Sequence, residues 1–463
     1  MPGLFYAHPM TVDRKAGAAR LRIELVALAV ALVTLLACSG WTPSSARAGS
    51  ARTQALSAQP HALLDGLNIP SIGAYPSLRA IDQTIAYAHT LHATVVRTTV
   101  AWSILEPRAP GQIEPRELAE TDRLVADASA AGIRVIMTVD STPCWDSSAP
   151  SALLRTCSPS AAGKANAWPP SNDADYAAFV ALLAQRYGNR LAAIEIWNEP
   201  DQANEHYLAG PEKPERYAAI LRAAYPAIKQ ANPSVPVLAG SLVGSNGVFL
   251  RALYAAGIKG YYDALAVHYY NLTIASLRSI REVQLANGDK TPLWLDEFGW
   301  SNCWPREREQ QEQACVTSRI QASNLLNTLR TLDRTPYVAA AMVYKLQDSS
   351  NENFGLLTAT GVRKPAFAAV ARVFASPFVS LSPVSLSLRR RGSHVVANGS
   401  APVGDFMELE AFQGSVLRYR ALFKLNRFNR YSLTLPAQLG MHGLRVRTYQ
   451  YATGPGGGVQ RSI

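Results

Sequence analysis

This sequence has few cysteines, few histidines and few glycine-rich segments, and their scarcity excludes several kinds of site. The five cysteines and eight histidines among 463 residues include no C-x-x-C and no H-x-x-x-H spacing, the usual marks of a metal site. A doubly wound nucleotide-binding sheet needs a glycine-rich loop after its first strand, where this chain reads Ile69-Pro-Ser-Ile-Gly73. We therefore expect neither a metal nor a cofactor.

The middle of the chain also lacks a net charge. The total is +11, but residues 1–49 hold five basic and two acidic residues, and residues 377–463 hold eleven and three. The remainder, residues 50–376, has 29 residues of each sign. A neutral central region argues against a nucleic-acid groove and suits an uncharged ligand such as a sugar.

The first 60 residues have the composition of an export signal and a linker. Basic residues precede the apolar run Leu25–Ala37, which predicts a signal within residues 1–38. Three alternatives stay open: lipoprotein processing at Cys38, ordinary cleavage after Ala46-Arg-Ala48, and an uncleaved membrane anchor. Residues 39–60 are interpreted as a linker. We expect an exported protein, either secreted or attached to a membrane.

Export suggests a role for the four other cysteines. Cys144 and Cys157 lie in one loop region, and Cys303 and Cys315 lie in another. Four cysteines allow three connectivities, and we expect the two local pairs to form disulfides in an oxidising compartment.

Strand-like and helix-like patterns alternate through residues 61–375. Helices are predicted between most of the strands, most clearly at 76–92, 115–131, 173–187, 214–232 and 310–332. This alternation predicts an α/β fold, a (β/α)8 or TIM barrel. The eight predicted strands are Leu63–Ile69, Thr94–Val100, Arg134–Asp140, Leu191–Asn198, Val235–Gly240, Ala264–Tyr269, Leu293–Glu297 and Tyr337–Lys345.

Residues 377–452 change to short segments in which apolar and polar residues alternate. Gly and Pro turns separate these segments, which is typical of antiparallel strands with one solvated face. We predict a small all-β, immunoglobulin-like C-terminal sandwich. Residues 453–463 are rich in glycine and are predicted to be a flexible tail.

Two of the predicted barrel strands lead into glutamates. Leu191–Asn198 runs into Glu199, and the strand from Leu293 carries Glu297 at its end. Because the carboxyl ends of barrel strands meet at one mouth, we expect the two carboxylates to face each other and act on a glycosidic bond. Asn198 and Glu199 are adjacent, so a bulge or turn must bring both side chains to the mouth.

Three motifs resemble those of a known enzyme group: Ile196-Trp-Asn-Glu-Pro200, His268-Tyr-Tyr270 and Trp294-Leu-Asp-Glu-Phe-Gly299. With the segment Val96–Pro107, they are similar to the retaining glycoside hydrolases of clan A. Family 39 and its cellulase-like bacterial endoglycosidase relatives are the most similar. The resemblance covers roughly residues 60–374. It implies a (β/α)8 barrel, with Glu199 as the acid/base and Glu297 as the nucleophile.

The same resemblance implies further site residues. Arg97 and Tyr270 match residues that contact the nucleophile, and His268 matches a histidine that lines the subsite. Asn198 would hydrogen-bond the sugar 2-hydroxyl group. Tyr344 stands where clan members usually have a tryptophan under the reacting sugar, a departure that bears on the shape of this subsite. The alternative for Arg97 is a buried ion pair elsewhere in the barrel. The alternative for His268 and Tyr270 is a packing role in the core.

Tryptophans at strand ends suggest sugar-stacking positions, because indole faces stack on the C–H faces of sugars. We expect Trp145 and Trp300 to form saccharide subsites. The alternative is that they cap the core.

The basic C-terminal segment suggests an anionic partner. Alternation along Leu417–Asn426 places Arg418 and Arg420 on one face, which suits an anionic wall polymer, an acidic polysaccharide or a lipid surface. A solvated face that serves solubility is the alternative. We expect no nucleic-acid partner, and the sequence does not predict an oligomeric state.

Two functions fit these features. The first is an exported retaining glycoside hydrolase that acts on a polysaccharide or oligosaccharide. The second is a carbohydrate-binding or cell-wall-associated scaffold whose barrel has lost turnover. The presence of both glutamates, with Arg97, Asn198 and Tyr270, favours the enzyme.

Overall fold

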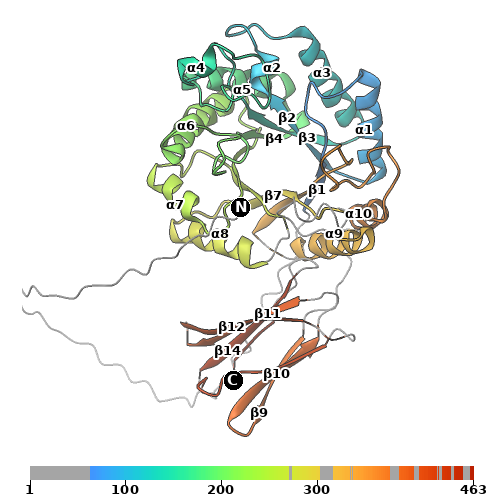
Figure 1. The fold of residues 1–463 in the computed structure, drawn as a ribbon, viewed down its shortest axis with the longest axis vertical. Coiled ribbons are helices and arrows are strands. Elements are labelled where there is room, and N and C mark those ends of the chain that lie inside the picture. Colours follow the sequence, from blue (N-terminus) through green and yellow to red (C-terminus); the bar gives the residue numbers. More distant parts are fainter. Residues whose placement is uncertain are drawn as a thin grey trace, which may run out of the picture. The chain divides into compact units, whose positions relative to one another are not determined.

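Eight parallel strands close into a barrel in the order of the sequence (Figure 1). The computed structural model describes residues 63–270, 274–302, 316–333, 335, 337–375, 385–400, 406–414, 416–424, 426, 430–439, 443–451 and 459–462. The predicted TIM barrel is confirmed. Its strands are β1 (Leu64–Asn68), β2 (Val95–Ala101), β3 (Arg134–Asp140), β4 (Leu191–Ile196), β5 (Val237–Leu242), β6 (Ala264–His268), β7 (Leu293–Phe298) and β8 (Val338–Val343).

Helices surround the barrel, and their first residues follow the usual rules for helix starts. Proline lies in the first turn of α3 and α6, and the side chains of Asn172 and Thr317 cap α5 and α9. The helices are α1 (Leu78–Thr90), α2 (Trp102–Leu105), α3 (Pro115–Ala130), α4 (Ser151–Leu154), α5 (Asp173–Tyr187), the 3₁₀ turn η1 (Gly188–Arg190), α6 (Lys213–Ala231), α7 (Val248–Ala255), α8 (Ile274–Ala286), α9 (Ser318–Leu332) and α10 (Pro365–Ala375).

The inside of the barrel is apolar at one level and charged at the next. Val95, Ile136 and Trp294 belong to a buried apolar cluster inside the barrel. Side chains alternate along a strand, so the residue two positions further on points the same way. Those residues are Arg97, Thr138 and Asp296, all buried. The charged level therefore lies between the apolar core and the mouth, at the carboxyl ends of the strands.

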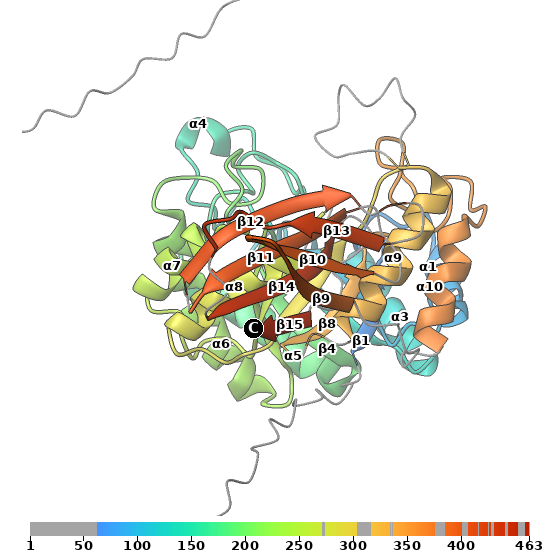
Figure 2. The ribbon, with the colours of Figure 1, turned by 90° about the horizontal axis from the view of Figure 1, so that it is seen from below.

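The C-terminal segment forms two antiparallel sheets, whose strands are seen in Figure 2. One apolar cluster, with Leu386 and Val395 from the first sheet and Leu409 and Val446 from the second, joins them as the predicted sandwich. The first sheet has the order β13-β10-β9 and the second β12-β11-β14-β15. The strands are β9 (Ser385–Arg391), β10 (His394–Ser400), β11 (Phe406–Gln413), β12 (Val416–Lys424), β13 (Arg430–Thr434), β14 (Leu444–Tyr451) and β15 (Val459–Ser462).

The structure describes part of the C-terminal segment but not the N-terminal one. Strand β15 pairs with β14, so part of the segment predicted to be a loose tail forms a sheet edge. The predicted signal and linker, residues 1–60, lie outside the described residues. Within the described ranges, no helix combines the length and the apolar character that a membrane span requires.

Candidate active site

The two predicted catalytic glutamates lie together at the mouth of the barrel. Glu199 follows β4, and Glu297 is near the end of β7. One carboxylate oxygen of each, and Nδ1 of His268, all lie within 4.8 Å of one another. Both glutamates are buried, with 6% and 8% of their surface exposed. The structure thus brings together two carboxyl groups from strands far apart in the sequence.

A turn of unusual backbone conformation brings Asn198 and Glu199 to the same side. Trp197 and Glu199 have φ angles of 68° and 42°, in the left-handed region that non-glycine residues rarely adopt. The fully buried indole of Trp197 anchors the turn, because its N–H donates to the Tyr207 carbonyl oxygen at 2.8 Å. The backbone N–H of Trp197 donates to Val139 at 2.9 Å. These contacts offset the conformational strain.

Two buried side chains hold Glu297. Arg97 donates through Nη1 to one carboxylate oxygen at 2.7 Å, and the hydroxyl of Tyr270 donates to the other at 2.5 Å. The Nη2 group of Arg97 also donates to Oδ1 of Asn198 at 2.9 Å. The side-chain oxygen of Asn198 accepts from Arg97, which leaves its amide nitrogen to donate to a ligand in the cavity that Asn198 lines.

Beneath the mouth, Arg97 belongs to a layer of charged groups whose carboxylates, Glu195 and Asp296, were not predicted as site residues. Arg97 donates through Nε to Glu195 at 2.7 Å and lies 3.4 Å from Asp296. Asp296 in turn lies 3.5 Å from Nε2 of His268, and Thr138 donates to Glu195 at 2.7 Å. Acidic residues within otherwise apolar strands were the available signal, because such residues are rarely buried unless they are paired.

Carboxylates of the mouth and of this layer together raise the pKa of His268. Burial alone would lower the pKa of His268, but the carboxylates of Glu297 and Asp296 outweigh burial and raise the pKa well above its ordinary value. The imidazolium donates from Nδ1 to Glu199 at 2.7 Å and lies 3.5 Å from Glu297. Burial also raises the pKa of Glu195, to about 7, although Arg97 opposes that shift. The site therefore carries two buried cations, Arg97 and His268, among its carboxylates.

The two glutamates face different cavities. A cavity of about 460 Å³ is lined by Glu297, Arg97, Asn198, Asp140 and Tyr344, among others. A second cavity, of about 690 Å³, is lined by Glu199, His268 and Tyr270 and by the loop around Gln202. A molecule that spans the carboxyl pair therefore has space on both sides.

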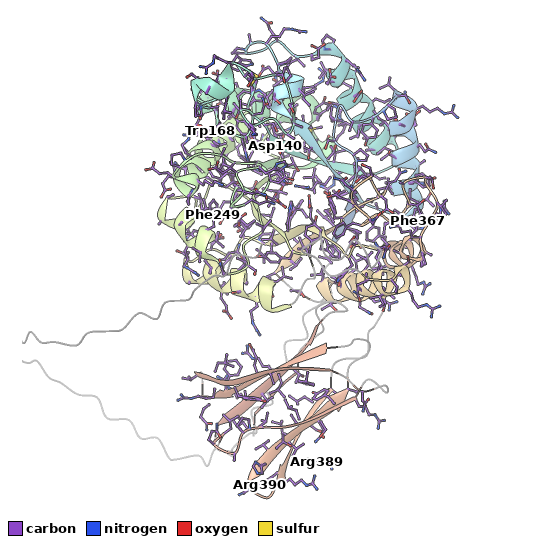
Figure 3. All side chains as sticks on the ribbon, in the orientation of Figure 1. Asp140, Trp168, Phe249, Phe367, Arg389 and Arg390 are labelled. Atoms are coloured by element: carbon purple, nitrogen blue, oxygen red, sulfur yellow. A yellow bond between two sulfur atoms is a disulfide. The ribbon has the colours of Figure 1, made fainter. Side chains whose placement is uncertain are left out.

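Asp140, at the end of β3, is a further polar residue of the first cavity and was not predicted as a site residue. It lies inside the ring of helices in Figure 3 and is 4% exposed. Burial raises its pKa to about 7, despite the hydrogen bond from the Ser141 hydroxyl at 2.9 Å. Near neutral pH its carboxyl group can thus donate as well as accept a hydrogen bond.

The aromatic residues divide into two sets. Tyr344 lines the Glu297 cavity, and its ring packs edge-on against Tyr270 and Phe354. The structure does not bring Trp145 and Trp300 to the walls of either cavity. Their role as subsites stays a prediction without a contact to support it.

Packing accounts for the positions of both indoles. Trp145 packs edge-on against the buried Trp102, and its N–H donates to the Glu106 carbonyl oxygen at 2.9 Å. Trp300 is 3% exposed and packs against Phe298.

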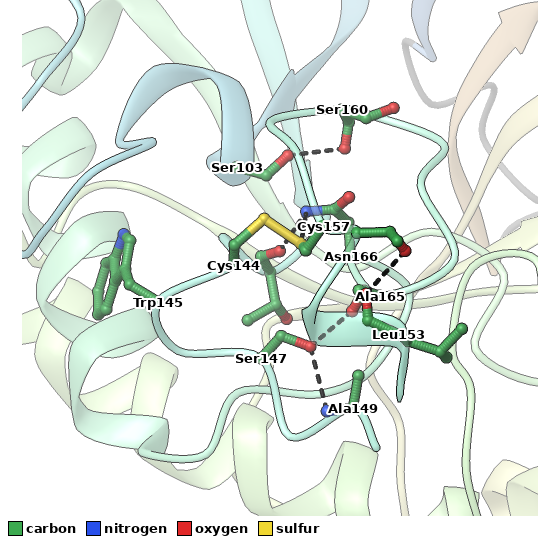
Figure 4. Close-up of a disulfide and its surroundings, with 12 residues drawn as sticks. Ser103, Cys144, Trp145, Ser147, Ala149, Leu153, Cys157, Ser160, Ala165 and Asn166 are labelled. Carbon is green, nitrogen blue, oxygen red and sulfur yellow. Dashed lines mark hydrogen bonds between the residues drawn. A yellow bond between two sulfur atoms is a disulfide. The ribbon is translucent and has the colours of Figure 1, made fainter. Parts of the chain in front are cut away.

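The predicted disulfide between Cys144 and Cys157 is present (Figure 4). It closes the loop after β3, and the Cα atoms of the two cysteines are 5.8 Å apart. Asn166, in the same loop, donates to the Thr142 carbonyl oxygen at 2.8 Å. The second predicted pair, Cys303 and Cys315, lies outside the described residues.

Comparison with solved structures identifies the same fold in glycoside hydrolases. A family 39 glycoside hydrolase from Bacteroides cellulosilyticus WH2 is 17% identical, with a TM-score of 0.53 over 81% of this chain and 79% of that chain. A monomeric beta-xylosidase from Caulobacter crescentus CB15 is 15% identical, with a TM-score of 0.51 over 81% and 94% of the two chains. At these identities the likeness concerns the fold.

Comparison at the level of sequence identifies the family. No curated protein matches the chain. The model of the family described as Cellulase (glycosyl hydrolase family 5) matches residues 57–325, more than half of the chain. The clan A resemblance is thereby confirmed. The chain belongs to the cellulase family, glycosyl hydrolase family 5, and is a glycosidase that acts on O-glycosyl compounds.

Proposed function

We propose that this glycosidase retains the configuration of the sugar, with Glu297 as the nucleophile and Glu199 as the acid/base. One observation carries the proposal: a carboxylate oxygen of Glu199 lies within 4.8 Å of one of Glu297. Retaining enzymes have carboxyl groups about 5–5.5 Å apart, whereas inverting enzymes need about 6.5–9.5 Å to admit a water molecule. The geometry of the pair supports retention.

In the first step, a carboxylate oxygen of Glu297 attacks the anomeric carbon. The bond from that carbon to the glycosidic oxygen breaks, and Glu199 transfers its proton to the departing oxygen. The fixed donors Arg97 and Tyr270 hold the Glu297 carboxylate for this attack. The products are a glycosyl ester of Glu297 and a free leaving group.

In the second step, Glu199 removes a proton from a water molecule, and the water oxygen attacks the same anomeric carbon. The ester bond to Glu297 breaks and its carboxylate is regenerated. His268 lies between the two glutamates, so its positive charge balances whichever carboxylate is ionised. The amide nitrogen of Asn198 donates to the sugar 2-hydroxyl group in both steps.

The substrate is an oligosaccharide or polysaccharide that occupies both cavities. The sugar that becomes attached to Glu297 sits in the cavity that Glu297, Asp140 and Tyr344 line. The leaving group sits in the larger cavity beside Glu199, because the acid must reach the glycosidic oxygen.

Proton NMR of the first product tests the proposal. We expect the newly formed sugar to have the same anomeric configuration as the substrate before it mutarotates. Initial formation of the opposite anomer would exclude Glu297 as a nucleophile. Denaturing mass spectrometry after incubation with a 2-fluoro glycoside should locate the sugar on the peptide that contains Glu297.

The other function that the sequence allowed, a carbohydrate-binding scaffold without turnover, is at odds with membership of a glycosidase family. A panel of aryl glycosides and cell-wall polysaccharides separates the two, because a scaffold would bind some of them and leave all of them intact. The hydrogen bonds from Arg97 and Tyr270 to Glu297 favour the enzyme, since a binding protein gains nothing from a nucleophile held at both oxygens.

Export is part of the same proposal. The disulfide between Cys144 and Cys157 supports it, because such bonds persist mainly in oxidising compartments. Mass spectrometry of the mature N-terminus from the native cell distinguishes the alternatives. A lipid-modified Cys38 indicates a lipoprotein, a start after Ala48 indicates secretion, and an intact, unmodified N-terminus in the cytosol would contradict export.

A further inference from the structure

The C-terminal sandwich contains a cavity of its own. Its volume is about 440 Å³, and it lies where β12 meets the loop that follows β13. Basic, aromatic and amide side chains line it together. The lining residues are Gln413, Arg418, Tyr419, Pro436, Gln438 and Leu439.

A bulge in β12 explains how a cation and a ring come to share one wall. Ala411 of β11 pairs with Tyr419, but the next residue, Phe412, pairs with Leu417. Arg418 is therefore the extra residue of the bulge. Bulges turn the side chain of the extra residue away from strict alternation, so Arg418 and its neighbour Tyr419 both reach the cavity.

The side chains of this wall have complementary chemical properties. Tyr419 is half-buried and packs against the sandwich core, which fixes its ring. Arg418 is exposed, and no carboxylate in the described part of the chain forms an ion pair with it. Among sandwich side chains that the structure describes, the single carboxylate is that of Glu410, which is 2% exposed. The guanidinium group of Arg418 is thus open to an anion from solution.

These groups together define a ligand class. A guanidinium group binds a carboxylate through two parallel hydrogen bonds, and a fixed aromatic ring packs on the C–H face of a sugar. The carboxamides of Gln413 and Gln438 suit sugar hydroxyl groups. A lipid surface would need a flat basic face rather than a cavity that contains a ring. The combination matches a sugar that carries a carboxylate.

We propose that this sandwich cavity is an accessory binding site for acidic polysaccharides that contain uronic acid residues. Its lining residues all belong to the sandwich, so it does not depend on the proposed catalytic roles. The site holds the chain on an anionic polymer through Arg418 and Tyr419, while the amides of the cavity contact the hydroxyl groups.

Binding of sodium polygalacturonate to the full-length protein tests the site, at about 0.15 M salt to suppress non-specific attraction. We expect Arg418→Gln to raise the dissociation constant at least about tenfold, as loss of a charge-assisted pair does. Arg389→Gln is the matched control. Arg389 is exposed on β9, at the hairpin labelled in Figure 3, and the substitution removes the same charge. It should change the dissociation constant less than about twofold. Gln438→Ala should weaken binding without removing a charge.

Other outcomes would overturn the proposal. Equal weakening by Arg418→Gln and Arg389→Gln indicates non-specific attraction to a basic domain. Binding of anionic phospholipid vesicles but not of polygalacturonate, with the same dependence on Arg418, indicates a membrane surface. No binding of polygalacturonate also excludes the site. Turnover of an aryl glycoside should stay unchanged in Arg418→Gln, so failure here is distinguishable from failure of the catalytic assignment.

Discussion

The two glutamates of the mouth are held in different ways. Glu297 accepts from Arg97 at 2.7 Å and from Tyr270 at 2.5 Å, and Arg97 is itself fixed by Glu195. Glu199 contacts His268 at 2.7 Å, and its other oxygen accepts from Gln202, which lies in the loop that lines the larger cavity. The buried layer holds Glu297 through Arg97, whereas a loop residue, Gln202, holds one oxygen of Glu199.

This contrast fits the two proposed roles, nucleophile for Glu297 and acid/base for Glu199. A nucleophile must stay in one position, and Glu297 does so because its donor Arg97 is itself fixed by Glu195 in the buried layer. An acid/base gives up and regains a proton in each cycle, so it needs a partner that can adjust and a route to water. The contact between Glu199 and the open loop provides both.

Removal of either carboxylate should have the largest effect and tests the contrast directly. Glu297→Ala should lower kcat by at least about 10⁴-fold on every substrate. Glu199→Ala should lower it by about 10²–10⁴-fold on substrates with poor leaving groups. Azide should restore turnover of activated aryl glycosides in Glu199→Ala alone, measured by release of the aryl group. Equal rescue of both variants would overturn the assignment of roles.

Arg97→Lys should have the next largest effect, because a lysine cannot contact Glu297, Asn198 and Glu195 at once. We expect kcat to fall by about 10²–10³-fold. Thermal unfolding of the same variant separates this loss from a general loss of structure. Activity within threefold of wild type, about 0.65 kcal/mol, would mean that the positive charge alone is sufficient.

Tyr270→Phe removes one donor to Glu297 and leaves the ring in place. A hydrogen bond to a charged group contributes about 1.5–3 kcal/mol, so kcat should fall about 10- to 150-fold. Tyr225→Phe is the matched control, because Tyr225 donates to Asp263 at 3.2 Å away from the mouth. Equal kinetic losses in both variants would contradict a specific role of Tyr270.

Asp140→Asn tests the pH dependence of the Glu297 cavity. Because burial raises the pKa of Asp140 in the folded protein from 3.8 to about 7, its contribution to stability is complete below the lower value and is lost as the pH rises through the higher one. Asparagine cannot ionise, so the free energy of unfolding of the variant should fall less as the pH rises from 3.8 to about 7. Urea titrations across that range measure the difference, at most about 1.4 kcal/mol per pH unit. Parallel curves for the two proteins would exclude this titration.

Gln202→Ala should have the smallest effect, because it removes only a neutral hydrogen-bond donor to Glu199, and that donor lies in a loop. We expect kcat to fall less than about tenfold. A loss as large as that of Arg97→Lys would show that Glu199 is as rigidly held as Glu297. Steady-state kinetics on one aryl glycoside compares the variants.

The barrel could be predicted because its signals are local. Apolar strands that alternate with capped helices determine this fold, and the boundaries of β3 and α5 are as expected from the sequence. The proximity of Glu199 and Glu297 was predictable because barrel geometry brings the strand ends together. The chain also belongs to the clan of glycoside hydrolases that its motifs suggested, and the family model that matches it is family 5.

The surroundings of the pair were less predictable. Trp145 and Trp300 were expected at the sugar, but whether an indole faces core or solvent depends on its neighbours, here Trp102 and Phe298. Asp296 inside an apolar strand indicates that it has a partner, because a buried carboxylate is rarely unpaired. Its partners come from other strands, and no local pattern encodes them.

The turn at Trp197 has a consequence for protein engineering. Asn198 and Glu199 face the same side because the residues at 197 and 199 adopt left-handed conformations, and the indole anchors them. A transplant of the asparagine and glutamate alone into another barrel would send one of them outward. The portable unit is the tryptophan-anchored turn, together with the carbonyl group of Tyr207 that receives the indole.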